Sequence, residues 1–393
     1  MKTIVGLEIH VQLATATKLF CGCSTDYRDD GPNTHCCPIC LGLPGSLPRL
    51  NRKAVEYGLL VAKALDMRVL EESDFARKNY FYPDLAKAYQ ITQSDRPLAV
   101  EGTVEIEDDE GHEKIVRITR VHLEEDPGRL VHVAGASKYS LVDYNRSGIP
   151  LLEIVTEPDM RSPQEARRFL NKLRTILEYL GVFDGEREGA LRVDANISIE
   201  GSARVEVKNI SSYKGVEKAL TFEATRQRNL LRRGQTVARE TRHFMEGRGI
   251  TTSARGKEEA HDYRYFPDPD LGPIRVADRV AAIDLPELPT ARKNRFMAQY
   301  GISLNHARTL TGDPRLADFY EHVAPADPIL AATWAADILL GELNYRNMSI
   351  AAVPADRIRE LLALLRAETI TDAAGVQVLR EMLDACAAGR PCE

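Results

Sequence analysis

Hydrophobic and polar residues alternate strictly near the start of the chain, in the stretch "VGLEIHVQL". The apolar set is Val5, Leu7, Ile9 and Val11, and the polar set is Glu8, His10 and Gln12. Successive side chains of a β-strand point to opposite faces, so this pattern predicts a strand over residues 2–12. One face of the strand should be buried, while the other presents a carboxylate, an imidazole and an amide in a row.

Further strands are predicted from similar alternation or from short apolar runs. They cover residues 102–107, 115–123, 150–156, 191–199 and 204–208. The last two are separated by "EGSA", which is typical of a hairpin turn. Their polar positions, from Arg192 and Asp194 to Lys208, form a second row that is either exposed to water or lines a cleft. Two aromatic loops, at 77–93 and 261–273, could form the walls of such a cleft.

One helix is marked clearly at both ends, in "SPQEARRFLNKLRTILEYLG". Ser162 is the expected N-cap, Pro163 occupies the first turn, Glu165 completes a capping box, and Gly181 ends the helix. Prolines at 286 and 289 then interrupt the pattern, and the rest of the chain has helical periodicity. We therefore expect an α+β domain over residues 1–287, followed by an all-α domain over 288–393.

Composition narrows the class of protein. The chain has 393 residues with 44% apolar residues, and it has no run near the ~20 apolar residues that a membrane helix needs. The N-terminus does not resemble a signal peptide, so we expect a cytoplasmic protein with no membrane partner. The net charge of −6 argues against binding nucleic acid mainly through phosphates. The arginines between 226 and 242 could still form a local basic face, or simply a solvated helix face.

Five of the seven cysteines lie between residues 21 and 40. Two close pairs, Cys21 with Cys23 and Cys37 with Cys40, have the spacing of a tetrahedral Zn²⁺ site. His35 and Cys36 compete as ligands, although the Cys-Pro-x-Cys turn favours Cys37. Four protein ligands would make the site closed and structural, whereas the alternative is a set of small buried thiols.

Carboxylates occur where the pattern predicts a core. Glu153 interrupts an apolar run from 149 to 155, and Glu124, Glu125 and Asp126 end another strand. Buried like charges require a cation, a donor or a proton. Together with His10 they indicate a hard divalent cation, Mg²⁺ or Mn²⁺. Periodicity does not decide between Glu124 and Glu125, and the alternative is three unrelated residues.

Many motifs, in order from residue 4 to about 350, resemble the B subunit of the Asp/Glu-tRNA (Asn/Gln) amidotransferases of bacteria and archaea. They are "GLEIHVQL", the CxC and "CPICLGLPG" cluster, "RKNYFYPDLAKAYQI", "HLEEDPG", "DYNRSGIPLLEIVTEPD", "RVDANISI" and "DYRYFPDPDL". The resemblance implies an antiparallel-sheet cradle like that of glutamine synthetase and the guanido kinases. It also implies a ligase that phosphorylates the side-chain carboxylate of mischarged Glu-tRNA(Gln) or Asp-tRNA(Asn) with ATP. Ammonia from the amidase (the A subunit), in a complex that also has a small C subunit, then displaces phosphate.

The same resemblance assigns roles to individual residues. His10, Glu125 and Glu153 match the family's Mg²⁺ ligands, and Glu8 is a candidate for binding a second ion or a water. Lys78 is a candidate for the mouth of the ammonia channel. The four cysteines of the paired motif match the zinc site of those members that keep it.

One departure from the family concerns the C-terminus. Family members continue for about one more domain, a tail that binds tRNA, and we expect this domain to be absent here. Two other functions remain open at this level. One is a non-catalytic, zinc-stabilised scaffold for tRNA or partner subunits, and the other is a free-standing ligase that captures ammonia directly.

Overall fold

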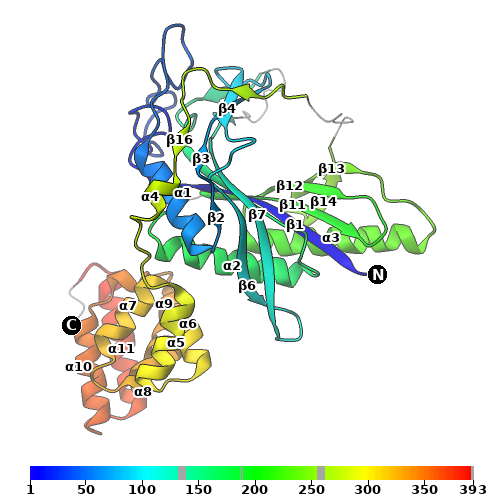
Figure 1. Ribbon diagram of the computed structural model, residues 1–393. Helices are drawn as coiled ribbons and strands as arrows, with labels where there is room; N and C mark the ends of the chain where they lie inside the picture. Colours follow the sequence, from blue (N-terminus) through cyan, green and yellow to red (C-terminus); the bar gives the residue numbers. More distant parts are fainter. Residues whose placement is uncertain (132–138, 186, 188, 255–261, 391–393) are drawn as a thin grey trace. The chain divides into compact units, whose positions relative to one another are not determined.

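The computed structural model describes residues 1–131, 139–185, 187, 189–254 and 262–390. The chain forms two compact units, Met1–Leu285 and Pro286–Glu393. The first is a mixed α+β unit with a large, mostly antiparallel sheet, and the second is helical (Figure 1). The predicted α+β class with a helical region after it is therefore confirmed.

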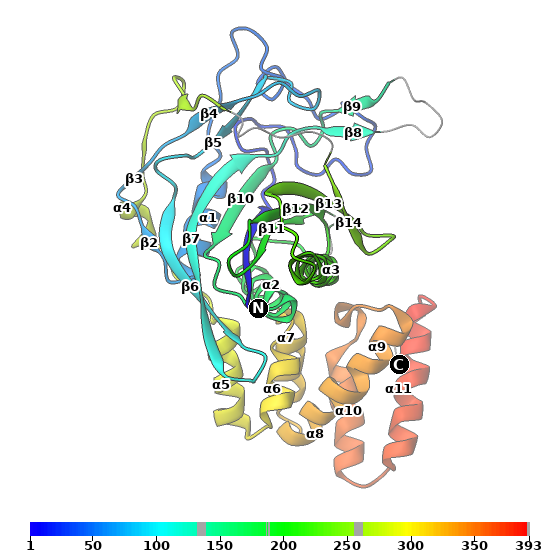
Figure 2. The ribbon, with the colours of Figure 1, turned by 90° about the vertical axis from the view of Figure 1, so that its right-hand side faces the viewer.

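A nine-stranded sheet forms the centre of the first unit within the described residues. Its strands, in order across the sheet, are β14 (Ile250–Ser253), β13 (Glu240–Met245), β12 (Val205–Ile210), β11 (Leu191–Ile199), β1 (Thr3–Gln12), β10 (Pro150–Thr156), β7 (Glu113–Glu125), β6 (Ala99–Glu107) and β2 (Arg68–Val69). Neighbouring strands are antiparallel, except that β12 and β13 run parallel. The N-terminal strand β1 thus lies in the middle of the sheet, between β10 and β11 (Figure 2).

The apolar face of this sheet is covered by three helices. They are α1 (Arg52–Ala64), α2 (Pro163–Tyr179) and α3 (Tyr213–Arg232). The alternating apolar residues of β1 are at most 1% exposed beneath them. The polar residues of β1 therefore lie on the opposite face, which no helix of this set covers (Figure 1).

Short strands and one long connection complete the first unit. The short elements are β3 (Glu72–Ser73), β4 (Ala76–Asn79), β5 (Tyr89–Thr92), β8 (Arg129–Val131), β9 (Leu141–Asp143), β15 (Phe266–Pro267), β16 (Ile274–Arg275) and α4 (Ala277–Val280). The order β15-β4-β5 makes a small separate sheet that places the two aromatic loops next to each other. Residues 13–51, which contain the cysteine cluster, form no helix or strand beyond an isolated bridge between Thr17 and Ser24.

The ends of α2 follow the expected rules with one variation. The Ser162 hydroxyl accepts a hydrogen bond from the Glu165 amide at 3.1 Å, and Gly181 has φ +64° just after the helix. Glu165 accepts from the amide of Arg161 at 2.7 Å, so the second half of the capping box involves the residue before the cap. The helix start is therefore fixed by local side-chain contacts.

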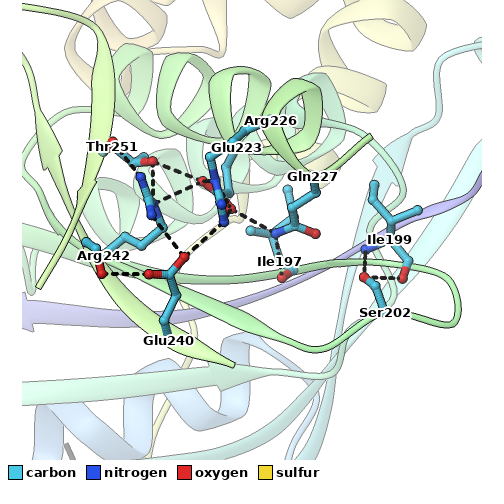
Figure 3. Close-up of polar contacts among 10 residues, drawn as sticks. Ile197, Ile199, Ser202, Glu223, Arg226, Gln227, Glu240, Arg242 and Thr251 are labelled. Carbon is cyan, nitrogen blue, oxygen red and sulfur yellow. Dashed lines mark hydrogen bonds and ion pairs between the residues drawn. The ribbon is translucent and has the colours of Figure 1, made fainter. Parts of the chain in front are cut away.

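A buried polar network ties α3 to the hairpin β13–β14 at the edge of the large sheet (Figure 3). The fully buried Glu223 accepts hydrogen bonds from Arg226, Gln227 and Thr251. Arg242 lies 3.4 Å from Glu223 and donates to Glu240 at 2.9 Å. Part of the arginine-rich run from 226 to 242 is thus an internal network, not a solvated or nucleic-acid-binding face.

The second unit consists of short helices. They are α5 (Pro289–Tyr300), α6 (Leu304–Leu310), α7 (Pro314–Val323), α8 (Pro328–Thr333), a π-helical turn (Trp334–Leu339), α9 (Leu340–Arg346), a 3₁₀ turn (Ile350–Ala352), α10 (Ala355–Arg366) and α11 (Asp372–Ala387). Phe296 and Tyr320 pack together in its core, with ring centroids 5.0 Å apart. No helix among the described residues is long and apolar enough to span a membrane.

Candidate functional site

Four polar side chains lie in one row across the middle of the sheet. In register, Arg192 of β11 faces His10 of β1, His10 faces Glu153 of β10, and Glu153 faces His122 of β7. Cross-strand neighbours in an antiparallel sheet share a face, so the row follows directly from the alternation of each strand. The polar row predicted on β1 therefore continues over four strands.

Three side chains of this region form a cluster suited to a cation. One ligand atom each of His10, Glu124 and Glu153 lies within 4.8 Å of the others. The Nε2 atom of His10 is 3.4 Å from Glu124 Oε1 and 3.5 Å from Glu153 Oε2. Both glutamates are buried. An imidazole with two carboxylates is a donor set that suits Mg²⁺ or Mn²⁺, so the residues present fit such an ion.

The structure does not bring Glu125 to this cluster, and Glu124 takes the predicted place of Glu125. Adjacent residues of a strand point to opposite faces. Glu125 forms an ion pair with Lys87 and accepts a hydrogen bond from the Ile91 amide at 2.9 Å. It lines a second cavity of about 100 Å³, which the cation cluster does not reach.

The electrostatics of the cluster are dominated by its carboxylates. Burial favours neutral His10, yet Glu153 and Glu124 raise the pKa of His10 to about 9. Burial likewise opposes ionisation of Glu153, but His122 and His10 hold the pKa of Glu153 well below its usual range. The site thus favours charged carboxylates with a positive group between them, which is the environment that a divalent cation requires.

Glu8 lies on the same face of β1, two residues from His10. Its Oε1 atom accepts a hydrogen bond from Asn196 at 3.0 Å. Burial and the charge of Glu153 raise the pKa of Glu8, and burial also raises the pKa of Asp194, its cross-strand neighbour. A second pair of acidic side chains therefore lies beside the cation cluster.

A polar cavity of about 730 Å³ opens above the cluster. Residues from the large sheet and from both aromatic loops line it. They include Glu8, His10, Lys78, Tyr80, Arg120, His122, Glu124, Glu153, Arg192, Asp194, Lys208 and Tyr265. Lys78, predicted near an ammonia channel, has its Nζ atom 4.7 Å from the ring centroid of Tyr263. The polar face of the β11–β12 hairpin thus lines a cleft, and the two aromatic loops contribute to its wall.

Sequence reasoning missed two cavity residues of β7, Arg120 and His122. The signal was present, because in "RVHLEE" the polar Arg120, His122 and Glu124 alternate with the buried Val121 and Leu123. The sequence placed Arg192 in a polar row but indicated no role for it. Its Nη2 atom donates to the buried Asp126 at 2.7 Å, which fixes the guanidinium at the cavity wall.

The four predicted cysteines come together in the irregular segment after β1. Sulfur atoms of Cys21, Cys23, Cys37 and Cys40 lie within 4.8 Å of one another, so they could hold a zinc ion. A hydrogen bond from Cys21 lowers the pKa of Cys40 to about 4, and the Cys37 amide acts in the same direction.

The competing ligands lie outside this group. His35 contacts Asp30 at 2.6 Å, and Cys36 is not part of the four-sulfur cluster. The buried Lys18 places its Nζ atom 3.8 Å from the sulfur of Cys40, and its positive charge also lowers the pKa of Cys40.

Comparison with known proteins identifies the family of the chain. A family model described as the GatB/GatE catalytic domain matches residues 3–282, and one described as the GatB domain matches 318–389. The B subunit of the aspartyl/glutamyl-tRNA(Asn/Gln) amidotransferase of Methanospirillum hungatei is 67% identical over 395 residues, covering 100% of this chain and 83% of its own length. The equivalent protein of Methanoregula boonei is 68% identical over 387 residues (97% and 80%), and that of Haloarcula marismortui is 50% identical over 418 residues (98% and 83%). The chain belongs to the family of aspartyl/glutamyl-tRNA(Asn/Gln) amidotransferase B subunits.

Proposed function

We propose that this protein activates the side-chain carboxylate of Glu on tRNA(Gln), of Asp on tRNA(Asn), or of both. The γ-phosphoryl group of ATP is transferred to a carboxylate oxygen, which gives an acyl phosphate and ADP. Ammonia then attacks the acyl carbon, the carbon–oxygen bond to phosphate breaks, and the amide and inorganic phosphate remain. The observation that supports this reaction best is the cluster of His10, Glu124 and Glu153 on the floor of the polar cavity.

The chemistry explains why such a cavity is needed. A carboxylate that attacks a phosphate brings two anions together, and the barrier falls only if positive groups neutralise and align them. A Mg²⁺ or Mn²⁺ ion held by His10, Glu124 and Glu153 would supply charge neutralisation for the phosphates. Arg120 of β7 and Arg192 of β11 line the same cavity as that cluster and can bind phosphate or carboxylate oxygens. We infer that Glu8 holds a second ion or a water beside it.

Ammonia must reach the acyl phosphate while water is excluded. Lys78 lines the main cavity, while its neighbour Arg77 lines the second cavity, next to Lys87 and Glu125. Adjacent residues of β4 therefore line two different cavities. We propose that ammonia enters beside Lys78, and that it comes from the amidase, the A subunit of a complex that includes a small C subunit.

The type of fold and the role of the zinc site are proposed from the resemblance to the family. The open antiparallel sheet with its cavity on one face agrees with a cradle of the glutamine synthetase and guanido kinase type. Zn²⁺ at the four cysteines would have a structural role, because four protein ligands leave no open position.

The test measures amide formation on mischarged Glu-tRNA and Asp-tRNA by the full chain, with its amidase partner, ATP and glutamine. We expect Glu153→Gln to lower turnover by roughly 100-fold, since it removes a charged cation ligand. The matched control is Glu113→Gln, an exposed glutamate of β7, which should be unaffected. Normal turnover of Glu153→Gln would contradict the proposal and favour a scaffold. Turnover with ammonium chloride alone, equal to that with the amidase and glutamine, would identify a free-standing ligase.

A further inference from the structure

His122 is a buried imidazole of the cavity that the proposed reaction does not use. It lies in β7, two residues before Glu124, and it faces Glu153 across the strand pair. The residue is 3% exposed and lines the cavity. Its place beside the cation cluster calls for a role, because a buried imidazole needs polar partners.

The contacts of the ring are one-sided. Its Nε2 atom lies 3.2 Å from Oε2 of Glu153 and 3.9 Å from Oε2 of Glu124. Its Nδ1 atom is buried and has no hydrogen-bond partner among the residues that the structure describes. A buried polar atom without a partner is rare in folded proteins, since it costs stability. The polar contacts of the ring are therefore those of Nε2 with the two glutamates, and the shorter of them is with Glu153.

The group of candidate ligands does not include His122, although His122 contacts two of its members. The three atoms that lie within 4.8 Å of one another belong to His10, Glu124 and Glu153, and no atom of His122 completes this group. Arg120, two residues before His122 in β7, is 3.9 Å from the second oxygen, Oε1 of Glu153. Glu153 is thus contacted by His10 of β1 and by His122 and Arg120 of β7.

We propose that His122 is a positioning residue of the cation site. It donates a hydrogen bond from Nε2 to Glu153 and fixes the orientation in which this carboxylate meets the cation. Groups of this kind, which hold a ligand without touching the metal, set the affinity of many metal sites. The inference rests on the proposed cation site and adds to it a residue that the family resemblance did not assign.

Two amide variants test this role in the full chain. Gln at position 122 can place its amide nitrogen near the position of Nε2, whereas Asn is too short to reach Glu153. Mn²⁺ binding without nucleotide or tRNA is measured from the electron paramagnetic resonance of the free ion. We expect His122→Asn to weaken Mn²⁺ binding by about 10- to 100-fold, and His122→Gln to stay within about threefold of the unchanged chain. The control His322→Leu, at an exposed histidine of the second unit, should not change binding.

Two further measurements distinguish a positioning role of His122 from a purely structural role and from direct binding to the metal. The unfolding temperatures of the metal-free Asn and Gln variants should be equal; a loss of stability that parallels the loss of Mn²⁺ affinity would overturn the proposal. Pulsed electron resonance of bound Mn²⁺ should show one imidazole nitrogen, from His10. Two such couplings, with one lost in His122→Asn, would make His122 a ligand and refute the positioning role. If the Asn variant does not fold, His122→Leu replaces it with the same expected weakening.

The outcome also distinguishes this inference from the proposed function. If the unchanged chain binds no Mn²⁺, the cation site itself is wrong. If the unchanged chain binds Mn²⁺ and every His122 variant binds it equally well, the site stands and the role of His122 fails.

Discussion

Glu124 and Glu125 are consecutive glutamates with different environments. Glu124 belongs to the cation cluster, whereas Glu125 pairs with Lys87 beside the second cavity. Both are at most 5% exposed, so each needs its own compensation for burial. Because side chains alternate along β7, Glu124 lines the main cavity and Glu125 lines the second cavity.

This difference gives a prediction for two matched variants. Glu124→Gln should weaken Mn²⁺ binding by at least about tenfold, because it removes a charged ligand. Glu125→Gln should leave Mn²⁺ binding unchanged and lower the free energy of unfolding by about 3 kcal/mol, because Lys87 stays buried without its counter-charge. Titration with Mn²⁺ measures the change in metal affinity, and urea denaturation measures the change in the free energy of unfolding. The reverse result, with Glu125→Gln losing the metal, would restore the assignment made from the sequence.

The sequence could not decide between these two residues for a physical reason. In β7 the buried apolar residues have even numbers at Val116 and Ile118 but odd numbers at Val121 and Leu123. The register of β7 against β10 shifts between Val155 and Thr156, opposite this change. An irregularity of this kind reverses which residues face the core, and it depends on the partner strand.

Among the elements, α3 links strands that the sequence did not pair. It follows β12 and precedes β13, and these two strands run parallel, so the helix is a crossover connection. The network around Glu223 attaches the resulting edge hairpin to this helix (Figure 3). The edge of the sheet next to Lys208 is therefore held by buried charge pairs as well as by backbone hydrogen bonds.

We expect Glu223→Gln to lower the free energy of unfolding by about 3 kcal/mol. The variant leaves Arg226 and Arg242 without their shared buried carboxylate. Urea denaturation measures the change. The control variant Glu200→Gln, at an exposed residue of the β11–β12 turn, should change the free energy of unfolding by less than ~0.5 kcal/mol. Equal stability of the two variants would show that the network contributes little.

Local patterns predicted the elements that depend on local rules. Strands 150–156 and 191–199, the hairpin that follows, and the capped helix from Pro163 occur as expected. The strand order across the sheet was not predictable, because the neighbours of β1 are more than 130 residues away in the chain. For the site, the polar row on β1 was identified from the sequence. The alternation in "RVHLEE" also places Arg120 and His122 on one face of a strand, but only the pairing of β7 with β10 shows that this face meets Glu153.

At the scale of the whole molecule, the segment 13–51 must be held in place without helices or strands of its own. It lacks helices and strands, yet Cys21 and Cys40 line the cavity that also contains Lys87 and Glu125. A metal cross-link is an effective way to order such a segment, because binding energy replaces a hydrophobic core. The four-cysteine cluster therefore supports a wall of the sheet unit.

We predict one Zn²⁺ per chain by elemental analysis after metal-replete expression. Removal of the metal with a chelator should lower the unfolding temperature, because the segment loses its cross-link. Cys40→Ser should abolish zinc binding, while Cys36→Ser, its matched control outside the cluster, should retain it. A chain that contains no zinc under these conditions would contradict the assignment.

The central position of β1 has a consequence for how the protein is made. Residues 3–12 leave the ribosome first, but their two neighbours in the sheet, β10 and β11, are synthesised only when translation reaches residues 150–199. Until then His10 has neither Glu153 nor Arg192 beside it. An unfinished polypeptide accordingly has no assembled cavity, and the capacity to bind a cation arises late, in the same event that completes the sheet.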